Sequence, residues 1–330
     1  MSFSYKSQTN ITAELQRQTI LGIVFSSVVS TLPCCVFLFI NGTMLFTLRS
    51  KAKFLETSRY ILLYNLLFSD TVQLAHNQVM FLMSGSRVTM LYPVCAALTV
   101  FNRLLHGVSV LTLVLMCLER YVAVCYPLRH AAIITIGNTG IAIGVVWTFS
   151  SVNIVIQLSL MLNFPFEELK QMQMKDFCGK DSLFLDPLFE LYDKASTYFI
   201  FVLACLSVSF SYIGIILAAR SASTDKASAK KAQNTLLLHL VQLGLTMSST
   251  LFKPLLMVIS KNLDRVISVR IHVFIYICII IFPKCLSSFI YGLRDQTIRP
   301  VLTFNLSCQW RSSSLKSAIQ TNTKIGILIM

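Results

Sequence analysis

Residues 115–130 read LMCLERYVAVCYPLRH and close a long apolar segment that begins near Val94. Within this stretch, Glu119, Arg120 and Tyr121 place an acid, a guanidinium and a phenol side by side. Because the preceding segment is almost free of charge, we expect these residues where a membrane helix meets the cytoplasm. An arginine at that depth is costly unless it is paired or reaches water. We therefore predict that Glu119 holds Arg120 in one state and releases it in another; the alternative is an ordinary flanking arginine that reaches the lipid headgroups.

The composition is that of a membrane protein. Of the 330 residues, 55% are hydrophobic and only 13% are charged, whereas a soluble domain carries about 25% charged residues. The net charge of +14 is compatible with nucleic-acid binding, but the surplus of lysine and arginine falls in the loops that we assign to the cytoplasm, as membrane orientation requires. We therefore expect the lipid bilayer as a partner, with a contribution from anionic lipid, and no nucleic acid.

Hydropathy along the chain predicts an all-α membrane protein, a seven-transmembrane helix bundle with a short cytoplasmic helix after span seven. Each expected span is long enough to cross about 30 Å of hydrocarbon. In chain order the spans are expected near residues 20–48, 60–83, 94–124, 141–162, 196–219, 230–259 and 269–290.

This topology divides the chain into three parts. Residues 1–19 form an extracellular amino terminus, 20–293 the seven-span domain and 294–330 a cytoplasmic tail. We expect no cleavable signal peptide, because the first apolar run is too long for one and acts as the first span. Asn10 begins an Asn-Ile-Thr sequon on the outer side and is a candidate for glycosylation. The expected location is the cell membrane, which the chain crosses several times.

The cysteines predict one disulfide. Of the ten cysteines, only Cys95 and Cys178 fall on the outer side in this topology. Two cysteines in an oxidising space without competitors are expected to pair. The bond would tether the long loop between spans four and five to the start of span three.

Polar residues inside the spans are the candidates for function. Asp70 lies in the middle of the second span, where a carboxylate indicates function by default; the alternative is a protonated or hydrogen-bonded packing element. In the third span, Thr99, Asn102, Arg103 and His106 recur at spacings of three and four residues. They therefore mark one helical face and its neighbour, which should face the bundle interior and not lipid.

Three motifs resemble those of known receptors. The Glu119-Arg120-Tyr121 run resembles the Asp-Arg-Tyr box of rhodopsin-like G-protein-coupled receptors and, in extended form, the Met-Ala-Tyr-Asp-Arg-Tyr-Val-Ala-Ile-Cys signature of olfactory receptors. Residues 230–240 resemble the Lys-Ala-x-x-Thr-Cys-x-x-His-Leu run that opens span six in olfactory receptors. Residues 283–294 resemble the olfactory ending Pro-Met-Leu-Asn-Pro-Ile-Ile-Tyr-Gly-Leu-Arg and look closest to fish odorant receptors.

The resemblance implies an odorant receptor and assigns roles to individual residues. A small odorant would bind among the outer halves of spans three, five, six and seven, and span six would swing outward. Arg120 would then meet the tail of a stimulatory Gα subunit of a heterotrimeric G protein. The switch residues that the resemblance implies are Glu119, Arg120, Tyr121, Tyr212, His239 and Tyr291.

The third motif departs from the family at the centre of the bundle. The resemblance implies an intramembrane polar group of Asn41, Asp70 and Ser287, but Ser287-Ser288 replaces the usual Asn-Pro. This departure bears on the coupling between spans two and seven, and we expect that a serine hydroxyl can still bond to Asp70. The single tryptophan of span four, Trp147, is interpreted as a packing residue.

Two cations suggest the charge of the ligand. Arg103 in span three and Lys253 in span six have no acid nearby within their own spans. One hypothesis is that they hold the carboxylate or sulfate of an anionic odorant, with Thr99, Asn102 and His106 as neutral contacts. The alternative is that Arg103 is neutralised within the protein. The acids considered for this role belong to the outer loop: Asp176, Asp181 and Asp186.

Two other functions are weighed against the odorant receptor. A receptor of the same superfamily for another ligand is one alternative, although Asn102 stands where amine receptors carry their acid. A transporter is the other, and it predicts inverted repeats with paired broken helices, which the spans do not show. The chain has no phosphate-binding glycine loop, metal-ligand cluster or nucleophile motif, so we predict no enzyme activity, metal or cofactor.

Overall fold

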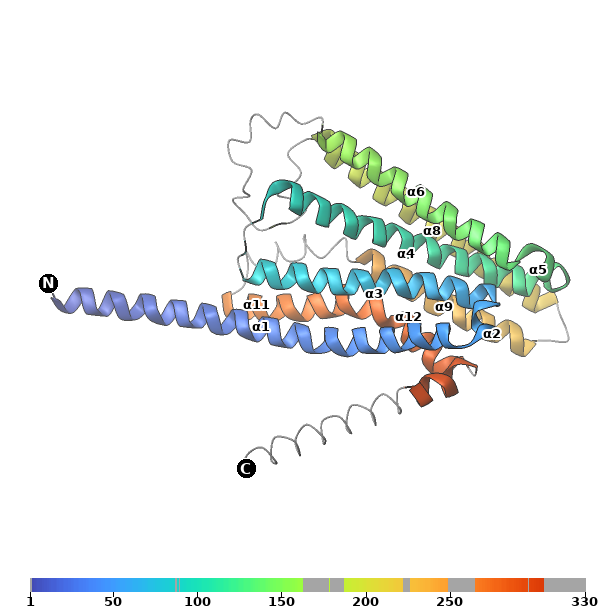
Figure 1. Ribbon diagram of the computed structural model, residues 1–330, viewed down its shortest axis with the longest axis horizontal. Helices are drawn as coiled ribbons and strands as arrows, with labels where there is room; N and C mark the ends of the chain where they lie inside the picture. The colour runs from blue at the N-terminus through green and yellow to red at the C-terminus, as the bar shows by residue number, and fades with distance from the viewer. Residues whose placement is uncertain are drawn as a thin grey trace, which may run out of the picture.

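The computed structural model describes residues 2–86, 88, 90–162, 178, 187–221, 226–248, 265–295 and 297–305. Only the backbone is described for residues 2–20, 23, 161–162, 219–221, 226–229, 231–233, 235–236, 239, 247, 265–266, 268–269 and 293–294. Long helices lie side by side in a bundle (Figure 1). They are α1 (Ser2–Ser50), α3 (Ser58–Gly85), α4 (Tyr92–Cys125), α6 (Ile136–Leu162), α8 (Pro187–Ser221), α9 (Lys226–Ser248), α11 (Arg265–Tyr276) and α12 (Phe282–Arg294). The short helices α2 (Ala52–Leu55) and α5 (Pro127–Ile133) lie in the connections.

Five helical segments in the described part of the chain are long and apolar enough to cross a membrane. They are Val24–Ser50, Tyr92–Cys125, Ile136–Leu160, Pro187–Ala218 and Arg270–Gly292. The last segment runs through α11 and α12. Helix α3 is more polar because it carries Asp70, Gln73 and Gln78, and it packs between α1, α4 and α12, where these side chains are buried.

Helix α4 lies at the centre of the bundle. It packs against α3, α6, α8 and α9, and its side chains from Val108 to Val114 are all buried. On α3, Leu63, Leu66 and Leu67 follow the spacing of one helical face and are fully buried in the main core cluster. By contrast, α6 and α8 expose large apolar side chains over much of their length, as expected for surfaces that face lipid.

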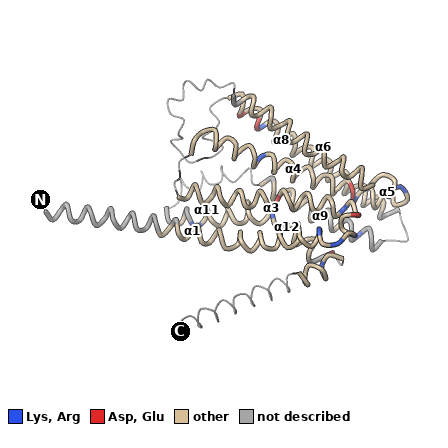
Figure 2. The backbone as a smooth tube through the Cα atoms, in the orientation of Figure 1, with Lys and Arg blue, Asp and Glu red and all other residues tan. Residues whose placement is uncertain are grey.

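Charged residues gather at one end of the bundle, near α2 and α5 (Figure 2). In the orientation that the charge distribution predicts, this end is cytoplasmic. Few charged residues lie along the middle of the described helices (Figure 2). Those few are therefore the candidates for function.

The seventh span is interrupted by a π-helical segment, Ile277–Ile281, between α11 and α12. Pro283 follows directly at the start of α12. Because proline has no backbone N–H and its ring clashes with the carbonyl four residues earlier, it disfavours regular α-helical hydrogen bonding in the turn that precedes it. Such wide turns recur at functional sites, and here the turn precedes Lys284.

Two helix starts differ most from the sequence-based expectation. Helix α8 begins at Pro187, whereas span five was expected from Ser196; proline is favoured in a first helical turn, and the earlier start places Asp193 inside the helix. Helix α1 runs from Ser2, so the amino-terminal segment, including the backbone of Asn10, continues the first span as a helix. Beyond α12, residues 298–305 form the expected short helix.

Candidate functional site

An ion pair lies at the centre of the bundle. The Lys284 ammonium is 3.1 Å from Asp70 Oδ1, and the Ser109 hydroxyl donates to the same oxygen at 2.7 Å. Asp70 is only 1% exposed and Lys284 only 5%. The pair joins α12 to α3, and Ser109 adds α4. Our sequence analysis singled out Asp70 but missed Lys284, although a lysine inside an apolar span is itself a signal.

The two serines of the altered third motif do not bond to Asp70. Ser288 donates to Asn41 Oδ1 at 2.6 Å, and Ser287 accepts a hydrogen bond from Gln242 Nε2 at 2.6 Å. Asn41 in turn donates to the Lys284 backbone carbonyl at 3.0 Å. The expected serine-to-aspartate contact is therefore wrong, because the long Lys284 side chain reaches the carboxylate from one turn away. The serines instead tie α12 to α1 and α9.

Trp147 has a polar role in addition to packing. Its indole N–H donates to Asn65 Oδ1 at 3.0 Å, and Asn65 Nδ2 donates to Thr112 Oγ1 at 2.9 Å. These bonds join α6, α3 and α4. The interpretation of Trp147 as a packing residue alone was incomplete, because the sequence contains no sign of which helix its N–H faces.

The cytoplasmic end of α4 carries the expected acid–arginine pair. Arg120 Nε lies 3.0 Å from Glu119 Oε2, and His130 Nε2 of α5 lies 3.7 Å from Glu119 Oε1. Glu119 is 6% exposed. One terminal nitrogen of the Arg120 guanidinium is buried and has no hydrogen-bond partner in the described part of the protein. Among the described residues, Arg120 is therefore held through Nε, with donor capacity left over.

The other predicted switch residues lie on α4, α8, α9 and α12. The Tyr121 ring lies 5.0 Å from that of Phe210 on α8, and Tyr212 packs against the core cluster shared by α4, α8 and α9. Tyr291 is buried at 2% exposure. His239 lies on α9, but its side chain is outside the described residues.

Tyr291 belongs to a second charged cluster that the sequence analysis did not identify. Arg59 Nη2 lies 3.0 Å from Asp295 Oδ2, and the Arg59 guanidinium carbon is 5.1 Å from the centre of the Tyr291 ring. The Tyr60 hydroxyl donates to Asp295 at 3.3 Å. This cluster joins the start of α3 to the end of α12. Arg59 directly precedes the expected second span, and Asp295 falls in the expected cytoplasmic tail. The available signal was therefore a basic residue directly before a span.

The outer end carries the predicted disulfide. Cys95 and Cys178 are bonded, with their Cα atoms 5.5 Å apart. Cys95 is fully buried beside Tyr92, Ala96 and Phe189 of α8. The prediction from cysteine topology is confirmed, and the bond fixes the outer end of α4 to the loop that precedes α8.

Arg103 is neutralised within the protein. Its guanidinium forms an ion pair with Asp193 of α8 and donates to Gln157 Oε1 of α6 at 3.1 Å. Asp193 is 1% exposed. The structure therefore supports the alternative that Arg103 is neutralised within the protein. The neutralising acid belongs to α8 and is none of the three outer-loop acids considered, because that helix starts earlier than expected. Asp176, Asp181 and Asp186, like Lys253 on the sixth span, lie outside the described residues.

The Gln73 side chain reaches the backbone of Asn102 just outward of the central ion pair. Gln73 Nε2 of α3 donates to the Asn102 backbone carbonyl of α4 at 3.4 Å. Gln73 Oε1 and Asn102 Oδ1 are both buried and have no hydrogen-bond partner among the described residues. Thr99, Asn102 and His106 are half-buried on α4, so this part of the predicted ligand face is turned into the bundle.

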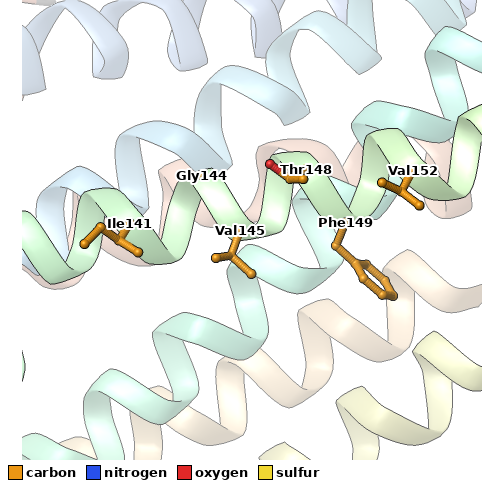
Figure 3. A pocket seen from close by; sticks show the side chains of 6 residues that line it. All are labelled: Ile141, Gly144, Val145, Thr148, Phe149 and Val152. Carbon is orange, nitrogen blue, oxygen red and sulfur yellow. The ribbon is translucent and has the colours of Figure 1, made fainter.

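A shallow apolar pocket lies on α6, away from these polar residues. It is lined by Ile141, Gly144, Val145, Thr148, Phe149 and Val152, which all belong to this one helix (Figure 3). Ile141 and Val145 are 68% and 61% exposed. We interpret this pocket as part of the lipid-facing surface, because it has no polar group from a second helix.

The fold and the polar residues define a membrane receptor, and comparison with known proteins identifies its family. Residues 40–291 match the family model of the 7 transmembrane receptor (rhodopsin family), so the chain belongs to the rhodopsin-like G-protein-coupled receptors. It is 32% identical to odorant receptor 131-2 of Danio rerio over 83% of both chains. It is also 26% identical to the human olfactory receptor 4K15, over 88% of this chain and 85% of that receptor.

These comparisons confirm several sequence-based predictions. The chain is a multi-pass membrane protein of a receptor family, and that family does not consist of enzymes. The resemblance to olfactory receptors, and to those of fish in particular, is confirmed by the Danio rerio relative. The ligand and the type of G protein are taken up below as proposals.

Proposed function

We propose that this protein is an odorant receptor that binds a small molecule in the outer half of the bundle and activates a stimulatory heterotrimeric G protein. The observation that carries the proposal is the half-satisfied Arg120 at the cytoplasmic end of α4. It is paired with Glu119 through one nitrogen at 3.0 Å, while another buried nitrogen lacks a partner within the described residues. A guanidinium with unused donors can exchange its intramolecular partner for the carbonyl groups of a Gα tail.

The polar contacts offer a route by which ligand binding reaches Arg120. The proposed ligand residues on α4 are Thr99, Asn102, Arg103 and His106, with Lys253 from the sixth span. Along the same helix, Ser109 contacts the Asp70–Lys284 pair, and Glu119 and Arg120 follow at the cytoplasmic end. A ligand shifts the receptor between states only by the difference in its affinity for them. Contacts that differ between the resting and the active positions of α9 and α12 would supply this difference in affinity.

The roles of the individual switch residues follow from this mechanism. Arg120 contacts the G protein, Glu119 restrains Arg120 in the resting state, and Tyr121, Tyr212, His239 and Tyr291 line the space that opens when the sixth span moves. Asn41, Asp70 and Ser287 transmit the movement of α12. We also propose that Asn10 carries a glycan on the outer side.

Ligand-dependent cyclic AMP production tests this function directly. The full-length receptor is expressed in cells with a stimulatory Gα subunit, and a panel of small odorants is applied. We expect at least one odorant to raise cyclic AMP in a dose-dependent manner, and Arg120→Ala to abolish the response at equal surface expression. A matched control is Arg129→Ala, since Arg129 is exposed on α5. A response that persists in Arg120→Ala would contradict the proposal.

A further inference from the structure

We propose that the ligand of this receptor is a neutral molecule that donates hydrogen bonds, an alcohol, diol or primary amide, and that Gln73 and Asn102 accept them. This inference rests on the proposed function and adds the chemical class of its ligand. It departs from the anionic odorant that the sequence suggested. Three features of the outer half of the bundle lead to it.

The first feature is that the two buried cations near this site among the described residues, Arg103 and Lys284, are already paired. Arg103 is neutralised by Asp193, and Lys284 by Asp70. A carboxylate ligand would have to displace Asp193, which is 1% exposed and would then be a buried acid without its counter-ion. Such uncompensated charge is strongly unfavourable. The described part of the site therefore favours a ligand without net charge.

The second feature is a pair of unused acceptors. Gln73 is 3% exposed, and its Oε1 and the Oδ1 of Asn102 are buried without a hydrogen-bond partner in the described part of the bundle. Buried polar groups in proteins are nearly always satisfied, and within a membrane no bulk solvent is present to satisfy them. The Gln73 amide is oriented with its nitrogen toward the Asn102 carbonyl, because the reversed amide would set one oxygen against another. The site therefore presents hydrogen-bond acceptors, which favour a ligand that carries hydrogen-bond donors.

The third feature is the position of these amides. Gln73 lies one turn outward of Asp70 on α3, and Asn102 lies two turns outward of Ser109 on α4. Since Ser109 and Asp70 are themselves bonded, the two amides stand above the inner polar contacts on the facing sides of both helices. A ligand that bonds to both amides would therefore join α3 to α4 directly above the Asp70–Lys284 pair.

The expected selectivity is for donors over matched molecules that lack them. A site built to hydrogen-bond a ligand group rejects the analogue without that group, because its own buried atoms are left unpaired. We expect an alcohol to be about tenfold to a hundredfold more potent than its methyl ether. A carboxylic acid of the same skeleton should be weaker than the alcohol. A diol or primary amide can donate a hydrogen bond to both acceptors and should therefore be the most potent of the series.

Ligand binding to the purified receptor tests the inference separately from signalling. For each carbon skeleton, the alcohol, diol, primary amide, methyl ether and carboxylate are compared by the rise in melting temperature of the receptor, which reports binding to the folded state, and by cyclic AMP in cells. Donors that stabilise the receptor without raising cyclic AMP would support the ligand class and contradict the proposed signalling function. Ethers or carboxylates that match the alcohols, or no stabilisation by any donor, would overturn the inference.

Two variants assign the selectivity to the named amides. Gln73→Met and Asn102→Leu remove an unsatisfied buried acceptor and replace it with apolar surface, so the unliganded melting temperature should be unchanged or higher. Each should reduce the alcohol-to-ether ratio by about tenfold. Asn234→Leu is the matched control, because Asn234 is exposed on α9, and it should keep the ratio. Full selectivity in both Gln73→Met and Asn102→Leu would overturn the assignment.

Discussion

Replacing Lys284 by methionine should destabilise the receptor strongly, because it leaves Asp70 as a buried charge without a counter-ion. The two groups are 3.1 Å apart and are 5% and 1% exposed, so neither can turn to water. Removing one partner of a buried pair costs about 3–5 kcal/mol. The bond from Ser109 to the same carboxylate oxygen remains, which places the expected loss toward the lower end of that range.

The neutral double variant separates loss of the pair from loss of packing. In Asp70→Asn with Lys284→Met, no charge is left unpaired, the asparagine still accepts from Ser109, and methionine fills much of the lysine volume. Replacing a whole buried pair by neutral groups is often close to neutral in stability. We therefore expect the double variant to be more stable than either single variant, with a coupling of roughly 3 kcal/mol.

Thermal unfolding of the detergent-solubilised receptor measures the relative stabilities of the wild type, the single variants and the double variant. Cys34, Cys117 and Cys285 are buried thiols that are not in a disulfide, so a thiol-reactive dye reports their exposure as the bundle opens. Scans are run at one fixed rate, because the unfolding of membrane receptors is governed by kinetics. Lys230→Met, at an exposed position on α9, serves as the control and should melt like the wild type. A wild-type melting temperature for Lys284→Met, or a double variant less stable than both single variants, would refute the reasoning.

Three further predictions concern the ends of the bundle. Cys178→Ser should abolish surface expression or ligand response, because it frees the outer end of α4; normal expression and signalling would argue against this role. Arg120→Ala should keep ligand binding but lose nucleotide exchange on Gα, and Glu119→Gln should raise basal exchange severalfold, since it weakens the 3.0 Å pair; unchanged basal exchange would leave Glu119 without a restraining role. Arg103→Met should lower the melting temperature more than the double variant with Asp193→Asn, and equal melting temperatures would show that the pair is not coupled.

Much of the architecture was predictable from local sequence. The apolar segments indicated the membrane spans, and the adjacent residues Glu119 and Arg120 indicated their own pairing. Cys95 and Cys178 were predicted as partners from topology alone, since no other cysteine shared their side of the membrane. These features depend on composition and on short-range order along the chain, which a single sequence displays directly.

The partners of the buried charges were decided by tertiary packing. Asp70 was recognised as a functional candidate, but Lys284 lies 214 residues away in the sequence and meets it only because α12 packs against α3 after the wide turn before Pro283. Asp193 reaches Arg103 only because α8 begins at Pro187, earlier than hydropathy predicted. Sequence alone determines that charges buried in a membrane must be compensated, because the cost of burial is a property of each residue. The identity of the compensating group depends on which helical faces meet, and only the folded bundle decides that.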